Sequence, residues 1–155
     1  MKKLKNSRKR KQSSWGIKTT NGTPLTDKID ILERWACFYE DLYSDVQSTL
    51  LTETTEQIPE ILIDEVQAAL KSCKNDKAAG PDGINAELLK FGGTYLETLL
   101  MNLFNRIIHT GTFPKDFNQA EIVAIFKKGD AADCGNYRPI SLLNHVYKVL
   151  MQIIY

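Results

Sequence analysis

Apolar residues recur at helical spacing along much of this chain, and two short apolar runs near its C-terminal end are typical of strands. Thr26 or Asp27 is expected to cap a first helix. The apolar face of that helix would be formed by Leu32, Trp35, Ala36, Tyr39 and Tyr43. We interpret this aromatic stripe as a packing surface, with an exposed aromatic surface for RNA as the alternative.

Further helical patterns cover residues 62–74, 85–91 and 94–110, and another begins after Asn144. Thr94 and Glu97 have the spacing of a capping box. Gly111 is expected to end the helix that follows them. Between two of these patterns, the sequence Gly80-Pro81-Asp82-Gly83 predicts a turn, because proline fixes the backbone at the second turn position.

The two apolar runs predict a pair of β-strands. EIVAIF (residues 121–126) is rich in β-branched and aromatic residues, and YRPISLL (residues 137–143) resumes the apolar pattern. The segment between them, KKGDAADCGN, contains the turn formers Gly, Asp and Asn. Lys127, Lys128 and Arg138 stand at the ends of the strands. Cations that reach one space from two facing strands suit a polyanion such as a triphosphate.

The order of these elements predicts an α/β (α+β) fold that is mostly helical with one β-hairpin. Two strands do not make a self-sufficient sheet, which favours an incomplete part of a larger enzyme. We divide the chain into a basic disordered tail (residues 1–24), a linker region with one helix (25–58) and a truncated main region (59–155). A chain of 155 residues with 43% hydrophobic residues can form an ordinary core.

The net charge of +1 conceals a strongly basic N-terminal segment. Residues 2–11 carry seven of the 20 cations and none of the 19 acids, so the remainder has a formal charge of −6. The basic residues are Lys2, Lys3, Lys5, Arg8, Lys9, Arg10 and Lys11. This tail is interpreted either as a nucleic-acid-binding or nuclear localisation patch, or as a solubilising tail or an arbitrary start in a broken reading frame.

Three widely spaced cysteines, Cys37, Cys73 and Cys134, argue against a disulfide framework and against a zinc site. They fit a reducing compartment, so we expect the chain in the nucleus or cytoplasm. No apolar run approaches the ~18 residues needed to cross a bilayer, and we expect no membrane partner. The N-terminus has no apolar run after its basic residues, so it does not predict a secretory signal.

Three segments, in this order, resemble the reverse transcriptases of non-LTR retrotransposons of the LINE-like and Jockey-like types. IDILERWACFYEDLY (residues 29–43) is similar to their linker between endonuclease and polymerase. KNDKAAGPDGINAELLKFGG (74–93) is similar to the segment before the fingers, and residues 113–143 are similar to the fingers. The resemblance implies an incomplete fingers part of a right-hand polymerase fold, acting in RNA-directed DNA synthesis with an RNA template, a DNA primer and a deoxynucleoside triphosphate.

The resemblance also implies roles for the hairpin cations. Arg138 corresponds to the arginine that contacts the triphosphate of the incoming nucleotide, and Pro139 restricts the backbone of Arg138 to an extended conformation. Strand alternation would place Lys127 and Lys128 on opposite faces, so only one of them would join Arg138. The other would contact the template backbone or keep that edge soluble. The alternative for Arg138 is an ordinary surface residue.

No catalytic or metal-binding residue is expected in this chain. The family binds two metal ions through palm carboxylates, which include a Tyr-x-Asp-Asp turn, and this sequence has no such motif. Tyr39-Glu40-Asp41 is a look-alike within a helical pattern, with Leu42 at the last position. Mg²⁺ is therefore assigned to the complete family enzyme, with no cofactor in this chain.

Because it ends at Tyr155, before any such motif, the chain alone is expected not to polymerise. The alternative function is a non-catalytic nucleic-acid-binding or interaction fragment from a decayed or co-opted element. Asp82, Asp130 and Asp133 are interpreted as turn residues. His109 is expected to contact the carbonyl end of its own helix. The oligomeric state is left open.

Overall fold

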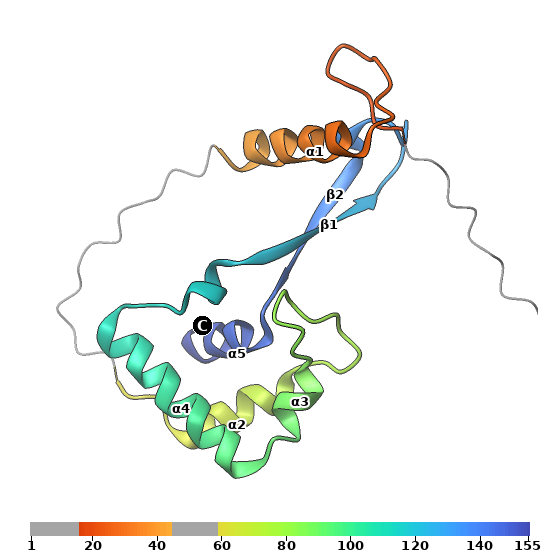
Figure 1. The fold of residues 1–155 in the computed structure, drawn as a ribbon. Helices are drawn as coiled ribbons and strands as arrows, with labels where there is room; N and C mark the ends of the chain where they lie inside the picture. Colours follow the sequence, from red (N-terminus) through yellow and green to blue (C-terminus); the bar gives the residue numbers. More distant parts are fainter. Residues whose placement is uncertain (1–15, 45–58) are drawn as a thin grey trace, which may run out of the picture. The chain divides into compact units, whose positions relative to one another are not determined.

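The computed structural model describes residues 16–44 and 59–155 and confirms the mixed α/β class (Figure 1). The described residues form five α-helices, two short 3₁₀ helices and one two-stranded antiparallel hairpin. The elements are α1 (Lys28–Tyr43), α2 (Ile63–Ser72), α3 (Ala86–Lys90), α4 (Gly93–Thr110), η1 (Lys115–Asn118), β1 (Ala120–Phe126), η2 (Cys134–Asn136), β2 (Tyr137–Leu143) and α5 (His145–Ile154). None of the helices in these two ranges is long and apolar enough to cross a membrane.

The described residues belong to two compact units. One unit contains residues 16–44 and 125–138, and the other contains residues 59–124 and 139–155. The first unit is discontinuous in sequence, because its two segments are separated by most of the second unit. The division at residues 24 and 58 inferred from the sequence stays a prediction, since residues 1–15 and 45–58 lie outside the described residues.

The core of the second unit lies where α2, α4 and α5 pack together. Val66, Phe104, Val149 and Leu150 are fully buried there. Helix α2 contacts both α4 and α5, and its Val66 belongs to the shared core cluster. Burial of each such side chain stabilises the fold by about 1.5–3 kcal/mol, which makes this cluster the principal source of stability of the unit. Three residues of α4, Leu100, Phe104 and Ile107, are buried on the side that faces this core.

The turn at residues 80–83 is held against the start of α5. The Gly83 N–H donates to the Gly80 carbonyl at 3.0 Å, which confirms the predicted turn. Asn144 occupies the N-cap position of α5, but its side chain accepts no capping hydrogen bond. Its Nδ2 instead donates to the Asp116 carbonyl of η1 at 3.0 Å. Asn144 therefore joins two elements rather than only capping one.

Helix α4 begins earlier than the sequence predicts. Its first residue is Gly93 and its N-cap is Gly92, without a side-chain hydrogen bond, so the capping box of Thr94 and Glu97 is wrong. Glu97 instead accepts a hydrogen bond from Gln67 of α2 at 2.7 Å. The C-terminal end of α4 is as predicted. Gly111 has a left-handed φ of 61°, and its N–H donates to the Ile107 carbonyl.

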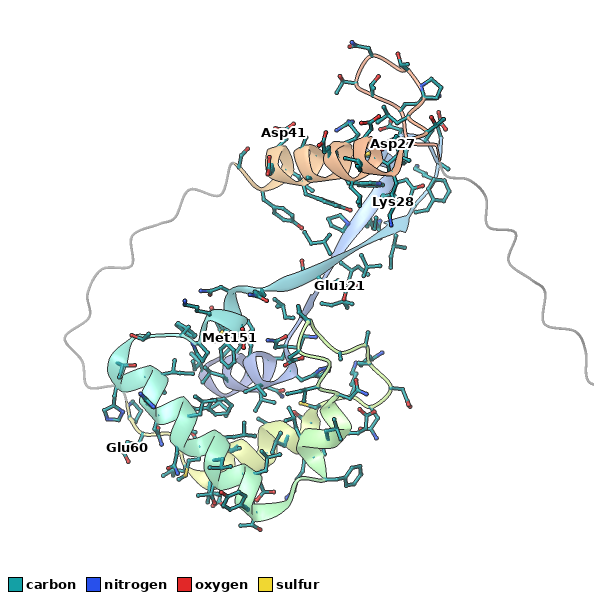
Figure 2. The ribbon with its side chains drawn as sticks, in the orientation of Figure 1. Asp27, Lys28, Asp41, Glu60, Glu121 and Met151 are labelled. Atoms are coloured by element: carbon teal, nitrogen blue, oxygen red, sulfur yellow. The ribbon has the colours of Figure 1, made fainter. Side chains whose placement is uncertain are left out.

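Helix α1 is capped as predicted but buries less than predicted. Asp27, at the start of the helix in Figure 2, accepts a hydrogen bond from the Ile29 N–H at 2.7 Å. No residue of α1 is fully buried. Leu32 of the predicted face is 58% exposed, whereas Trp35 and Tyr39 are partly buried. Packing of α1 thus depends on its aromatic rings.

Candidate anion-binding hairpin

A tightly closed loop connects β1 to β2 within the first unit. β1 ends at Phe126, and the Lys127 N–H then donates to the Asn136 carbonyl at 2.8 Å. Asn136 Nδ2 also donates to the Asp130 carbonyl at 3.0 Å. Gly129 has a φ of 94°, and a Cβ there would lie 2.9 Å from the Asn136 amide. The loop therefore needs glycine at position 129 for both its backbone conformation and its space.

The two loop aspartates are used inside the loop. Asp130 Oδ1 accepts from the Ala132 N–H at 2.9 Å, and Asp133 Oδ1 accepts from the Gly135 N–H at 2.9 Å. Both residues are thus turn residues, as the sequence predicts. Within residues 16–44 and 59–155, no group of three or more His, Cys, Asp or Glu residues is placed to hold a metal ion.

Aromatic rings of α1 pack against the loop end of the hairpin. The rings of Trp35 and Tyr137 meet edge to face with their centroids 5.1 Å apart. Tyr39 stacks on Trp35 at 5.5 Å, and Phe126 meets Tyr137 at 5.3 Å. The Tyr137 hydroxyl donates to the Ala131 carbonyl at 2.7 Å, which ties the ring cluster to the loop. These contacts support the packing interpretation of the α1 stripe.

Burial governs the titration of the groups around this cluster. It raises the pKa of the Tyr137 and Tyr39 hydroxyls, and these phenols therefore stay neutral at physiological pH. Burial likewise raises the pKa of the Cys134 thiol, which is 1% exposed. A protonated, enclosed thiol is a poor nucleophile, so Cys134 serves here as a small apolar side chain.

Three exposed cations lie at the loop end of the hairpin. Lys127, Lys128 and Arg138 are all exposed, and none forms an ion pair with another residue in the described part of the chain. Arg138 lies on β2, and Pro139 follows it in the same strand. Both lysines lie beyond the last residue of β1, so their predicted membership of that strand is wrong. Strand alternation therefore does not assign which lysine faces Arg138.

A cation that the sequence analysis missed pairs with one carboxylate of the loop. Lys18 Nζ lies 2.6 Å from Asp130 Oδ2, and the Lys18 N–H donates to the Ala132 carbonyl at 2.8 Å. The few apolar residues of 16–24 predict part of a disordered tail, but these residues form a small antiparallel turn with a bridge between Lys18 and Pro24. The signal that identifies it is Asn21-Gly22, a favoured turn dipeptide, with Gly22 at a φ of 84°.

The predicted nucleic-acid-binding residues of the tail lie outside the described residues. They are Lys2, Lys3, Lys5, Arg8, Lys9, Arg10 and Lys11. Their role stays a prediction.

The predicted position of His109 at the carbonyl end of its helix is confirmed, because its Nδ1 lies 2.7 Å from the Asn105 carbonyl in the last turns of α4.

Known proteins similar to this chain are named as proteins of transposable elements. A transposon TX1 protein of Xenopus laevis, named as an uncharacterized 149 kDa protein, is 28% identical over 86% of this chain and 11% of its own length. The Pol polyprotein from the type-1 retrotransposable element R1 of Bradysia coprophila is 33% identical over 59% of the chain and 9% of its own length. The RNA-directed DNA polymerase from mobile element jockey of Drosophila funebris is 32% identical over 61% of the chain and 10% of its own length.

The chain thus spans about a tenth of the length of the curated relatives it matches. No family model matches it. The names of these relatives confirm the resemblance to non-LTR retrotransposon proteins.

Proposed function

We propose, from the premise that this chain is homologous to a short segment of non-LTR retrotransposon proteins, that its hairpin serves as the phosphate-binding fingers of a reverse transcriptase. In this proposal Arg138 binds the triphosphate of the incoming nucleotide. One of Lys127 and Lys128 assists it, and the other contacts the template backbone. The observation that carries the proposal is the set of three exposed cations at one end of a closed hairpin, without carboxylate partners among the described residues.

The chemistry of these side chains suits a phosphate chain. A planar guanidinium donates two parallel hydrogen bonds to phosphate oxygens, and Pro139 restricts the backbone of Arg138 to an extended conformation. An ammonium acts as a point charge, so a lysine can follow the charge of the phosphates without fixing their orientation. Asp130, the acid closest to the two lysines in sequence, is already paired with Lys18. The cations are therefore free to bind an external anion.

The described residues do not fit the Mg²⁺ ions of the family enzyme. Asp130 uses one carboxylate oxygen for the Ala132 amide and the other for Lys18. Asp133 is used by the Gly135 amide. The part of catalysis proposed for this chain is consequently binding and orientation of the nucleotide, with RNA template and DNA primer as the partners of the whole enzyme.

A chimera tests this proposal. The chain would be joined to the remaining polymerase part of a jockey-type enzyme, and Arg138→Ala would be compared with wild type in primer extension on an RNA template. Loss of a charge-assisted contact costs about 1.5–3 kcal/mol. We therefore expect kcat/KM for the nucleotide to fall about ten- to hundredfold. Arg138→Lys should recover only part of it, because an ammonium cannot make the bidentate contact.

Arg106→Ala is the matched control, since Arg106 is an exposed arginine on α4, in the other unit. It should leave the nucleotide dependence unchanged. If Arg138→Ala keeps the nucleotide dependence and weakens RNA binding, Arg138 is a template contact and the assignment fails.

The second candidate function is non-catalytic nucleic-acid binding by the chain itself. It is favoured by the same accessible cations, which would bind the phosphates of any nucleic acid. Primer extension separates the two, because a binding fragment does not restore synthesis in the chimera.

A further inference from the structure

The segment just before α1 folds into a turn that is connected to the hairpin loop. Within the segment, the Thr19 N–H donates to the Thr23 carbonyl at 2.8 Å and the Leu25 N–H donates to the Ile17 carbonyl at 2.7 Å. Ile17 is 2% exposed although it lies near the start of the described residues. Such burial shows that the segment is packed into the first unit, which also contains the loop.

Two different kinds of contact join this segment to the loop. The Lys18 N–H donates to the Ala132 carbonyl at 2.8 Å, which depends only on the backbone. Lys18 Nζ pairs with Asp130 Oδ2 at 2.6 Å, which depends on charge. The two residues are 112 positions apart in the chain. The same loop begins with Lys127 and ends just before the strand that contains Arg138. A change in the conformation of the loop would therefore change the positions of the cations of the proposed function.

We propose that residues 16–25 form a clasp on the loop, and that Lys18 is a positioning residue that sets the charge of the anion-binding end by neutralising Asp130. The inference rests on the proposed function for its ligand, a triphosphate. The clasp itself rests on the contacts above. Without Lys18, the Asp130 carboxylate stands two residues from Lys128 and competes with phosphate for the lysines.

The charge balance of the loop explains why this neutralisation matters. Lys127, Lys128 and Arg138 are opposed by Asp130 and Asp133, which leaves a single net positive charge on residues 127–138. Lys18 doubles that net charge to two. The carboxylate and ammonium of the pair are about half exposed, at 54% and 41%, so the pair adds little to stability. Its effect is therefore expected on anion binding, where the sign and number of nearby charges act directly.

A charge series in the full chain tests the role of Lys18, with binding of inorganic triphosphate measured by calorimetry at low and at physiological salt. Lys18→Met removes the cation, keeps the backbone bond to Ala132, and should weaken binding severalfold at low salt. Asp130→Asn removes the acid, keeps an oxygen for the Ala132 amide, and should bind at least as tightly as wild type. The double variant should return to near wild type. Lys71→Met, an exposed lysine on α2, is the control and should change nothing.

This ordering separates a charge role from a structural one. If Lys18 mattered only as a structural contact, Asp130→Asn would break the same pair and weaken binding as Lys18→Met does. That outcome would overturn the charge role. Equal binding by wild type and Lys18→Met would overturn it as well.

The clasp has a readout that does not need the ligand. Hydrogen–deuterium exchange of the peptide covering residues 127–136 should be about tenfold faster in Ile17→Ala, which removes the buried anchor and keeps every charge. Unchanged exchange would overturn the clasp. If Arg138→Ala leaves triphosphate binding intact while Ile17→Ala accelerates exchange, the proposed function fails and the clasp stands.

Discussion

Gly80 and Asn144 are in such close contact that a Cβ on Gly80 would lie 2.6 Å from both the backbone nitrogen and the Oδ1 of Asn144. Asn144 Oδ1 is buried and has no hydrogen-bond partner among the described residues. The contact joins two segments that the sequence analysis treated separately, the Gly-Pro-Asp-Gly turn and the end of the second strand. Because Gly80 has no side chain, Asn144 at the start of α5 can pack directly against the turn.

Gly80→Ala is therefore expected to destabilise the second unit. The backbone of Gly80 has no positive φ, so the effect is steric and should be about 1–3 kcal/mol, as for other overpacked sites. Urea unfolding would measure it. Gly83→Ala is the matched control, because Gly83 has a φ of 68° and open space around it. It should cost only about 1–2 kcal/mol of backbone strain. An unaffected Gly80→Ala protein would show that α5 can shift to accommodate the methyl group.

Asn105→Ala should cost about 2–4 kcal/mol, because it leaves a buried backbone N–H and C=O without partners. Asn105 Oδ1 accepts from the Ile61 N–H at 2.7 Å, and its Nδ2 donates to the Ile61 carbonyl at 3.0 Å. Ile61 is 5% exposed, so water does not readily replace the amide. Asn102→Ala, an exposed asparagine on the same helix, should change the free energy of unfolding by less than about 0.5 kcal/mol. Equal urea midpoints of unfolding for the two variants would contradict the role of Asn105 as the partner of the Ile61 backbone.

Phe104→Ala should be among the most damaging substitutions in the second unit. Its side chain, on α4, is fully buried in the core cluster with residues of α2 and α5, and truncation leaves a cavity that costs about 3–5 kcal/mol. Thermal unfolding followed by circular dichroism would record the loss. Phe91→Ala provides the comparison, because Phe91 is 81% exposed and should be near neutral. A small effect at Phe104 would mean that the core collapses around the missing ring.

The Lys18–Asp130 pair predicts a pH window for the loop. The hydrogen bond from Lys18 lowers the pKa of Asp130 below its ordinary 3.8, and the bond to Asp130 raises the pKa of Lys18 above its ordinary 10.5. The contribution of the pair is then lost as the pH falls through the lowered carboxyl pKa, or rises through the raised ammonium pKa. Carbon NMR titration of the Asp130 carboxyl group would test this. In Lys18→Met its pKa should move back toward 3.8, with the Ala132 amide retaining part of the shift.

The basic tail gives a prediction that does not depend on the hairpin. Deletion of residues 1–12 removes the seven clustered cations and should abolish most non-specific RNA binding by the chain. The affinity of the intact chain should fall with salt at a log–log slope of roughly −0.7 for each phosphate contact on single strands. A filter-binding series over salt concentration measures both. Undiminished binding by the truncated chain would assign RNA binding to the body instead.

Local signals predicted the elements well and the contacts between them poorly. The left-handed Gly111, the Asp27 cap and the loop aspartates each follow from a few neighbouring residues. Gly80–Asn144, Asn105–Ile61 and Lys18–Asp130 join positions far apart in the chain, and no periodic pattern contains that information. Helix α4 shows a local signal that failed, since its N-cap is Gly92 and not the predicted Thr94. At the candidate site, sequence predicted the three cations and missed the residue that neutralises the acid beside them.

The discontinuous first unit has a consequence for the order in which the protein folds during synthesis. α1 contains no fully buried residue, and its Trp35 packs on Tyr137, which the ribosome adds much later. At about 5–20 residues per second, α1 waits roughly 5–20 s for that partner. Residues 59–124 emerge in the meantime. The first unit can fold only after the long-range contact between Trp35 and Tyr137 forms. We therefore expect the folding of this unit to be slower than that of the second unit.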